Sequence, residues 1–305
     1  MISKIHLEIL NYFPNYIKEK FIHISEKDWE KAREIRIRNN KPIIISRFDK
    51  DIIIDYIASS EDILRLIENF SENSLYKVQN EINEGFITIK GGHRIGISGT
   101  GVIENGKIKN IKYISSLNIR IAREVIGCSN DLLDILCKEQ IESLENTIII
   151  SPPGCGKTTL LRDLIRNLSN GYRNLLPKVI GVVDERNEIS ATYMGQAQNN
   201  LGIRSDVMNS CKKTIGIRLM IRSMGPDIVA TDEIGTDEDI ESIGQAIVSG
   251  VNLLVTTHGS SLEDIPEELR KNNVFKNVVV LGKNYKPGFI KNIYKLKGEN
   301  YVSIY

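Results

Sequence analysis

The sequence predicts an α/β fold in which a smaller α+β domain with antiparallel strands precedes a larger domain built on a parallel sheet. From about residue 126 onward, short apolar segments alternate with amphipathic segments of helical length. Such alternation is typical of parallel strands joined by crossover helices. Before that point, glycine-containing turns separate short apolar segments, which is typical of hairpins. We therefore place the boundary within residues 123–127 and predict domains over residues 1–125 and 126–305.

In the N-terminal domain, Ser59 and Asp62 have the spacing of a capping box, which predicts the start of a helix. Ile63, Ile67 and Phe70 then lie on one face of that helix. The antiparallel strands are expected over Phe86–Lys90, Arg94–Ser98, Val102–Ile108, where Asn105-Gly106 forms the turn of a hairpin, and Ile111–Ile121.

The C-terminal domain is expected to begin with a helix over Asn130–Lys138. Strands and helices then alternate along the chain. The expected elements are strand Thr147–Ile150, helix Lys157–Leu168, strand Val179–Val183, strand Ile228–Thr231, helix Asp237–Val248 and strand Leu253–Thr257.

Composition restricts the compartment and the partners of this chain. It has 305 residues, 41% of them hydrophobic and 26% charged, and a formal net charge of +1. Near-zero charge gives no electrostatic reason to expect binding to nucleic acid or directly to a membrane. The four cysteines form no CxxC pair, and the N-terminus lacks the pattern of a signal peptide. We expect a cytoplasmic protein with reduced thiols that reaches a membrane only through partner proteins.

A glycine-rich segment between an apolar strand and a helix predicts a phosphate-binding loop, or Walker A motif. In such a loop the backbone N–H groups, helped by the helix N-terminus, surround the phosphates of a nucleotide. Lys157 would reach the β- and γ-phosphates of ATP, and the Thr158 hydroxyl would bind Mg²⁺. The first position is Ser151 where the motif has glycine. The expected ATP-binding residues are Ser151, Pro152, Pro153, Gly154, Cys155, Gly156, Lys157, Thr158 and Thr159.

A second apolar strand ends in Asp232-Glu233, which has the form of a Walker B motif. Asp232 would hold Mg²⁺ together with Thr158, and Glu233 would take a proton from the water that attacks ATP. A solvated strand end is the alternative. The phosphate-binding loop makes this alternative the weaker one.

Three further groups are candidates for the same site, each with an ordinary structural alternative. Asp184 and Glu185 end another apolar strand, and Glu185 is a candidate catalytic acid unless it only borders the cleft. Thr256 and Thr257, and less strongly His258, could sense the γ-phosphate, although a lone histidine is often simply packed or solvated. An arginine of a neighbouring subunit could stabilise charge on the transferred phosphoryl group, unless it only makes a surface ion pair. The arginines considered for this role are Arg204, Arg218 and Arg222.

Together these motifs predict a RecA-like P-loop ATPase core, and they resemble the secretion-type motor ATPases of type II and type IV secretion and pilus machines. More narrowly, the chain resembles the stage III sporulation protein AA family of endospore-forming bacteria. The segments that carry the resemblance are Gly91–Gly96, Ile114–Glu124, Pro152–Arg162, Asp184–Arg186 and Ile221–Asp227. The resemblance implies a mother-cell ATPase that forms a hexameric ring, docks on integral-membrane proteins and energises a channel to the forespore.

Two other functions stay open at this point. A nucleic-acid-dependent ATPase would share the core, but the sequence lacks a basic patch interleaved with aromatic residues. A nucleotide-binding scaffold that caps a channel without hydrolysis would not need Glu233 beside Asp232.

Overall fold

The computed structural model describes residues 4–47, 49–72, 74, 78–138, 144–283 and 288–305 of the chain. The chain divides into two compact units, of which the first comprises residues 1–123 together with 193–198, and the second residues 124–192 and 199–305. The sequence did not suggest that residues 193–198 group with the N-terminal unit. Tyr193 donates a hydrogen bond to Glu72, and Gly91 N donates one of 2.9 Å to Gln198 Oε1.

The first unit is a six-stranded antiparallel sheet with strand order β3-β2-β1-β6-β5-β4 among the described residues. Its strands are β1 Ala32–Arg38, β2 Lys41–Arg47, β3 Ile52–Ala58, β4 Phe86–Thr88, β5 Arg94–Glu104 and β6 Lys107–Arg120. Its helices are α1 Lys4–Leu10, α2 Asn15–Lys18, the 3₁₀ helix η1 Glu19–Phe21, α3 Glu26–Lys31, α4 Ser60–Phe70 and α5 Gln79–Asn83.

Helix α4 shows how the sequence determines an element locally. Ser59 Oγ accepts from Asp62 N, and Asp62 returns a bond to Ser59 N, so the predicted capping box is present. Ile63, Ile67 and Phe70 point into one core together with Phe21 and Trp29 of the preceding helices.

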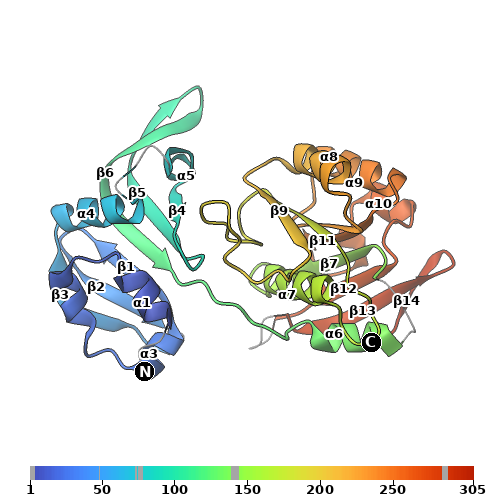
Figure 1. Ribbon diagram of the computed structural model, residues 1–305, viewed down its shortest axis with the longest axis horizontal. Coiled ribbons are helices and arrows are strands. Elements are labelled where there is room, and N and C mark those ends of the chain that lie inside the picture. Colours follow the sequence, from blue (N-terminus) through green and yellow to red (C-terminus); the bar gives the residue numbers. More distant parts are fainter. Residues whose placement is uncertain (1–3, 48, 73, 75–77, 139–143, 284–287) are drawn as a thin grey trace. The chain divides into compact units, whose positions relative to one another are not determined.

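The β5–β6 hairpin differs from the prediction of several short strands. Both strands are continuous and meet at a turn in which Asn105 and Gly106 have φ of 52° and 74°, as a type I′ hairpin turn requires. Its outer end projects from the rest of the sheet (Figure 1) and exposes Ile103 and Tyr113. The pairing register shifts between Ser98 and Thr100 and between Val102 and Ile103, where the ladder is irregular.

The second unit is an eight-stranded mixed sheet, with order β14-β13-β12-β7-β11-β10-β8-β9 among the described residues. All neighbours from β12 to β9 are parallel, and β13 and β14 extend one edge with antiparallel pairing. Its strands are β7 Thr147–Ser151, β8 Ile180–Asp184, β9 Ser205–Asn209, β10 Ile228–Thr231, β11 Asn252–His258, β12 Asn277–Leu281, β13 Ile290–Lys297 and β14 Asn300–Ser303. Its helices are α6 Asn130–Lys138, α7 Lys157–Asn170, α8 Lys213–Met224, α9 Asp237–Val248, the 3₁₀ helix η3 Leu262–Asp264 and α10 Glu267–Lys271. The sequence analysis did not predict β9, α8, α10, β12 or the antiparallel edge.

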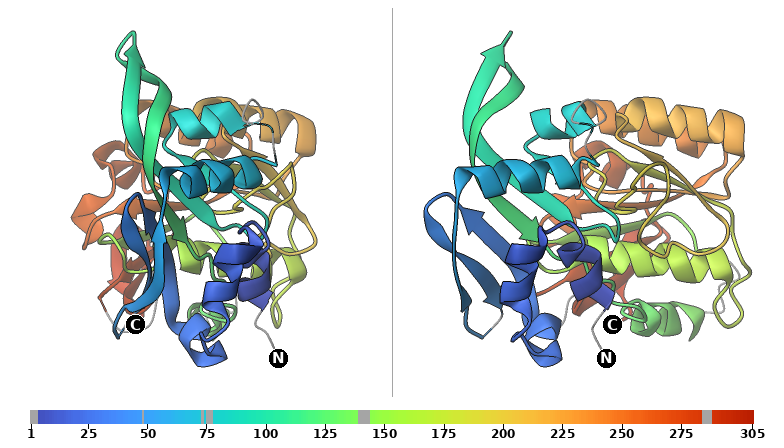
Figure 2. Two further views of the ribbon diagram at one scale, coloured as in Figure 1. Left: turned by 90° about the vertical axis from the view of Figure 1, so that its left-hand side faces the viewer. Right: turned by 60° about the vertical axis from the view of Figure 1, so that its left-hand side comes forward.

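Two apolar cores cover the two faces of this sheet. Ile149 of β7 faces a core that contains leucines of α6 and α7, whereas Ile148 and Ile150 face a core formed with α8, α9 and α10. Figure 2 shows these helices on opposite sides of the strands. Because both faces are buried, the central strands are apolar without alternation, as parallel strands usually are. No helix of the described residues is long and apolar enough to cross a membrane.

Candidate active site at the carboxyl edge of the parallel sheet

The strand order brings the predicted polar residues to one edge of the second unit. Strands β7, β11, β10 and β8 are neighbours in that order and run in parallel, so their carboxyl ends meet. Ser151 ends β7, His258 ends β11, Asp232 and Glu233 follow β10, and Asp184 ends β8.

The glycine-rich loop has the backbone that phosphate binding needs. Gly154 and Gly156 have φ of 77° and 87°, a conformation that other residues adopt only with strain, and Gly156 is the N-cap of α7. Ser151, by contrast, completes β7 and has no positive φ. A glycine is therefore not required at the first position of the motif, and the replacement brings no backbone strain.

Lys157, Glu233 and His258 form a close cluster. Lys157 Nζ lies 3.0 Å from Glu233 Oε1 and 2.9 Å from Nδ1 of His258, and His258 Nε2 lies 3.0 Å from the same carboxylate oxygen. Lys157 Nζ also lies 3.0 Å from Nε2, so it is nearly equidistant from the two ring nitrogens of His258. Partial burial acts to raise the pKa of Glu233. The hydrogen bond from Lys157 and the nearby positive charges outweigh it, so the pKa lies below its usual range.

The backbone at Glu233 is held in an uncommon conformation by the neighbouring strand. Its φ is 44°, in the left-handed region, and its N–H donates a 2.9 Å hydrogen bond to Thr256 Oγ1. Thr257 Oγ1 donates to Ile234 O at 3.0 Å. Both threonines are buried and brace the segment that carries Glu233, whereas the more exposed His258 contacts Lys157. The side chain of His258 therefore contacts other side chains of the cluster, whereas Thr256 and Thr257 contact the backbone of residues 233 and 234.

Asp232 is suited to a metal ion that would be bound with the nucleotide. Its side chain is 1% exposed, and neither carboxylate oxygen has a hydrogen-bond partner among the described residues. Burial and the charge of Asp184 raise the pKa of Asp232 to about 7, against the influence of Lys213. The described residues contain no cluster of three or more His, Cys, Asp or Glu side chains able to hold a metal alone. Mg²⁺ fits this arrangement, because it commonly binds one or two protein oxygens and takes its other ligands from water and phosphate. Thr158, in the first turn of α7, would supply the second oxygen.

Asp184 and Glu185 have different surroundings. Asp184 is fully buried and accepts hydrogen bonds from Glu188 N, Ser190 N and Ser190 Oγ at 2.6–2.8 Å, so it organises the loop after β8. Glu185 Oε2 lies 2.9 Å from the Nζ atom of the buried Lys213. The predicted catalytic acid Glu185 is therefore paired on the α8 side of the sheet edge and not with Lys157.

The structure does not bring the predicted arginines to this cluster within one chain. Arg204 donates from Nη1 to Ser169 O near the end of α7, and that helix begins at Lys157. At 1.5 Å per residue the two helix ends are roughly 20 Å apart. Arg218 and Arg222 line a surface groove between α8 and α9. Arg204, Arg218 and Arg222 could then act only on the site of a neighbouring subunit, which is the role that the sequence analysis considered for them.

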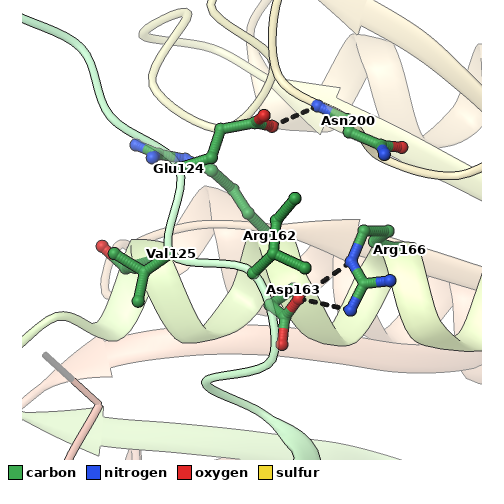
Figure 3. Close-up of a pocket in the computed structure, with 8 residues that line it drawn as sticks. Glu124, Val125, Arg162, Asp163, Arg166 and Asn200 are labelled. Atoms are coloured by element: carbon green, nitrogen blue, oxygen red, sulfur yellow. Dashed lines mark hydrogen bonds and ion pairs between the residues drawn. The ribbon is translucent and has the colours of Figure 1, made fainter.

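The sequence analysis missed three side chains. Arg186 Nη1 lies 2.7 Å from Glu233 Oε2. Lys213, besides pairing with Glu185, lies 3.9 Å from Asp239 Oδ1. Asp163 of α7 pairs with Arg166 (Figure 3). It also anchors the start of the unit, because Gly127 N and Ser129 N donate to it at 3.0 and 2.8 Å. Nothing in the sequence distinguishes Lys213 and Asp163 from other charged residues. Arg186 could have been found, because it lies two residues after the end of a strand and in a segment that carries the family resemblance.

Comparison with known proteins identifies the family of this chain. The family described as "Sporulation stage III, protein AA" matches residues 6–301. The chain belongs to this family. It is 38% identical over 296 residues to stage III sporulation protein AA of Bacillus subtilis (strain 168), and the match covers 95% of each chain. A shorter match, 31% identical over 150 residues, is to the uncharacterized protein ycf45 of Cyanidium caldarium and covers 49% of this chain and 42% of that protein.

Solved structures show the same fold at low sequence identity. The Legionella pneumophila ATPase DotB is 16% identical with a TM-score of 0.57, covering 88% of this chain and 76% of that chain. The pilus retraction motor PilT with bound ADP is 12% identical, also with a TM-score of 0.57, covering 81% and 73%. This member of the sporulation family therefore has an α/β fold that resembles secretion ATPases.

Proposed function

We propose that this chain is a RecA-like, Mg²⁺-dependent ATPase that acts as the motor of a secretion-like channel complex in endospore formation. The observation that carries the proposal is the position of Glu233. It lies beside the lysine of the phosphate-binding loop and next to a buried acid whose oxygens have no hydrogen-bond partner among the described residues. This combination supplies a group for each step of ATP hydrolysis.

Each residue of the site would have a separate role in ATP binding or hydrolysis. The loop amides and Lys157 would bind the phosphates of ATP, which requires Lys157 to leave Glu233. Glu233, released by Lys157 but still in contact with His258 at Oε1, would accept a proton from the attacking water, so that ATP and water give ADP and phosphate. Asp232 and Thr158 would hold Mg²⁺, which neutralises charge on the phosphates. His258 would stay beside Glu233 and orient it.

The family match and the fold support a proposal about the assembly in which the chain acts. We propose a homo-oligomer, a hexameric ring, in the mother-cell cytoplasm that docks on integral-membrane components of the channel. An arginine such as Arg204 or Arg222 would then act on the site of a neighbouring subunit. In that case the specific activity should fall when the protein is diluted below the concentration at which the ring assembles.

Steady-state phosphate release with Mg²⁺-ATP tests the proposal. We expect turnover by the wild type, a loss of about 10²–10⁴-fold in Glu233→Gln with ATP binding retained, and loss of both in Lys157→Ala. Lys271→Ala is the matched control, because Lys271 makes an exposed ion pair with Glu267 on α10, away from these residues in the sequence. Tight ATP binding without turnover at any concentration would favour a scaffold. Stimulation by single-stranded nucleic acid that is lost at moderate salt would favour a nucleic-acid motor.

A further inference from the structure

The two oxygens of the Glu233 carboxylate have different partners. Oε1 faces Lys157 and His258, and Oε2 faces Arg186 at 2.7 Å. The proposed reaction uses Lys157 and Oε1, so it changes the surroundings of one oxygen and leaves the contact of the other in place. Arg186 can therefore keep its contact with Glu233 during the reaction, whereas Lys157 must leave it, although both pair with the same carboxylate in this structure.

The segment that carries Arg186 is braced on both sides of this residue. Before it, Asp184 accepts from Glu188 N and from Ser190 N and Oγ. After it, Asn187 Oδ1 accepts from Thr192 N at 2.7 Å, and Asn187 Nδ2 donates to Thr192 O at 2.9 Å. These bonds close a compact loop with buried polar groups that are satisfied from within. Arg186 projects from a fixed base, even though its side chain is 63% exposed.

Glu233 needs such support once its lysine is withdrawn. Its backbone is in the left-handed region, and its side chain is 20% exposed, so solvent reaches it. A shift of about 1 Å in a catalytic group can lower a rate by about 10²-fold. His258 is half exposed and holds the same oxygen that must face the water.

We infer that Arg186 is a positioning residue for the proposed hydrolysis. It holds Oε2 of Glu233 so that Oε1 stays directed at the attacking water after Lys157 has moved to the phosphates. The planar guanidinium suits this task because it fixes the direction of its hydrogen bonds, which a lysine ammonium does not. The inference depends on the proposed function, since it assigns a role within that reaction.

A double-mutant cycle of Arg186→Ala and Glu233→Gln tests the inference, with single-turnover hydrolysis of labelled ATP at high enzyme concentration as the readout. We expect Arg186→Ala to lower the hydrolysis rate by about 10–100-fold and to change ATP affinity by less than about threefold. Because Arg186 acts through Glu233, it should have almost no further effect in the Glu233→Gln background. Arg186→Lys should recover only part of the rate, and methylguanidinium should partly rescue Arg186→Ala.

The control is Arg65→Ala, since Arg65 is 51% exposed and pairs with Glu61 on α4 at a similar distance, 2.6 Å. Thermal unfolding and ATP binding of each variant separate a loss of fold from a loss of positioning. Equal losses from Arg186→Ala in the two backgrounds would overturn the inference, as would wild-type hydrolysis by Arg186→Ala. Absence of hydrolysis in the wild type would instead contradict the proposed function itself.

Discussion

Replacing Asp232 by asparagine should stabilise the metal-free protein at alkaline pH. The reason is that a carboxylate buried without a partner must lose its hydration on folding, whereas a neutral amide of the same shape loses much less. Asp232 is 1% exposed, and its pKa is raised from 3.8 to about 7. In the proposed function the same side chain binds Mg²⁺, so the substitution should also abolish Mg²⁺-dependent hydrolysis.

The pKa shift of Asp232 gives the size and the sign of the expected change in stability with pH. A group with a raised pKa binds more protons in the folded than in the unfolded state, so its contribution to stability falls as pH rises between the two pKa values. One pKa unit corresponds to about 1.4 kcal/mol. Between pH 5 and pH 8, ionisation of Asp232 should therefore cost the wild type about 2–3 kcal/mol that Asp232→Asn does not lose.

Urea unfolding in EDTA at pH 5 and pH 8 measures this difference. From pH 5 to pH 8, the free energy of unfolding of Asp232→Asn relative to that of the wild type should rise by about 2–3 kcal/mol. Asp134→Asn provides the control, because Asp134 is partly exposed and pairs with Arg173 at 2.6 Å. A difference between Asp232→Asn and wild type that is the same at both pH values would refute the reasoning, because the cost would then not come from the charge.

Three other substitutions should have measurable effects. Asp163→Asn places an amide N–H against backbone donors, so we expect a loss of about 2–4 kcal/mol in chemical unfolding at pH 7. Burial raises the pKa of Asp163, but its hydrogen bonds lower it by more. The stabilisation that these bonds give the wild type should therefore be lost as pH falls below about 4. Thr256→Val leaves the N–H of Glu233 without its acceptor, and should cost about 1–3 kcal/mol and lower hydrolysis without preventing ATP binding. Lys213→Met leaves Glu185 without its cation and should cost about 1–3 kcal/mol in thermal unfolding, and an unchanged melting temperature would show that the pair contributes nothing.

The elements that the sequence predicted well are those with local causes. A capping box begins α4, the Asn105-Gly106 turn closes the β5–β6 hairpin, and the phosphate-binding loop lies between β7 and α7. In each case the deciding contacts lie within a few residues, so the residue types reveal them.

The elements that the sequence did not predict depend on distant partners. The edge strands β13 and β14 pair with segments whose own sequences carry no signal for that pairing. Residues 193–198 group with the N-terminal unit through Glu72 and Gly91, which lie more than a hundred positions away. A pattern of apolar residues indicates that a segment is buried, but it does not identify the segment against which it packs.

The same division applies to the candidate site. The sequence by itself determined which residue types are present for nucleotide chemistry: the glycine-rich loop with Lys157, and the acids Asp232 and Glu233 after a buried strand. Only the tertiary structure decided the pairings, with Glu233 held by Lys157, His258 and Arg186, and Glu185 held by Lys213. The physical reason is that ion pairs form between side chains that the strand order brings to one edge, and that order follows from packing of the whole sheet.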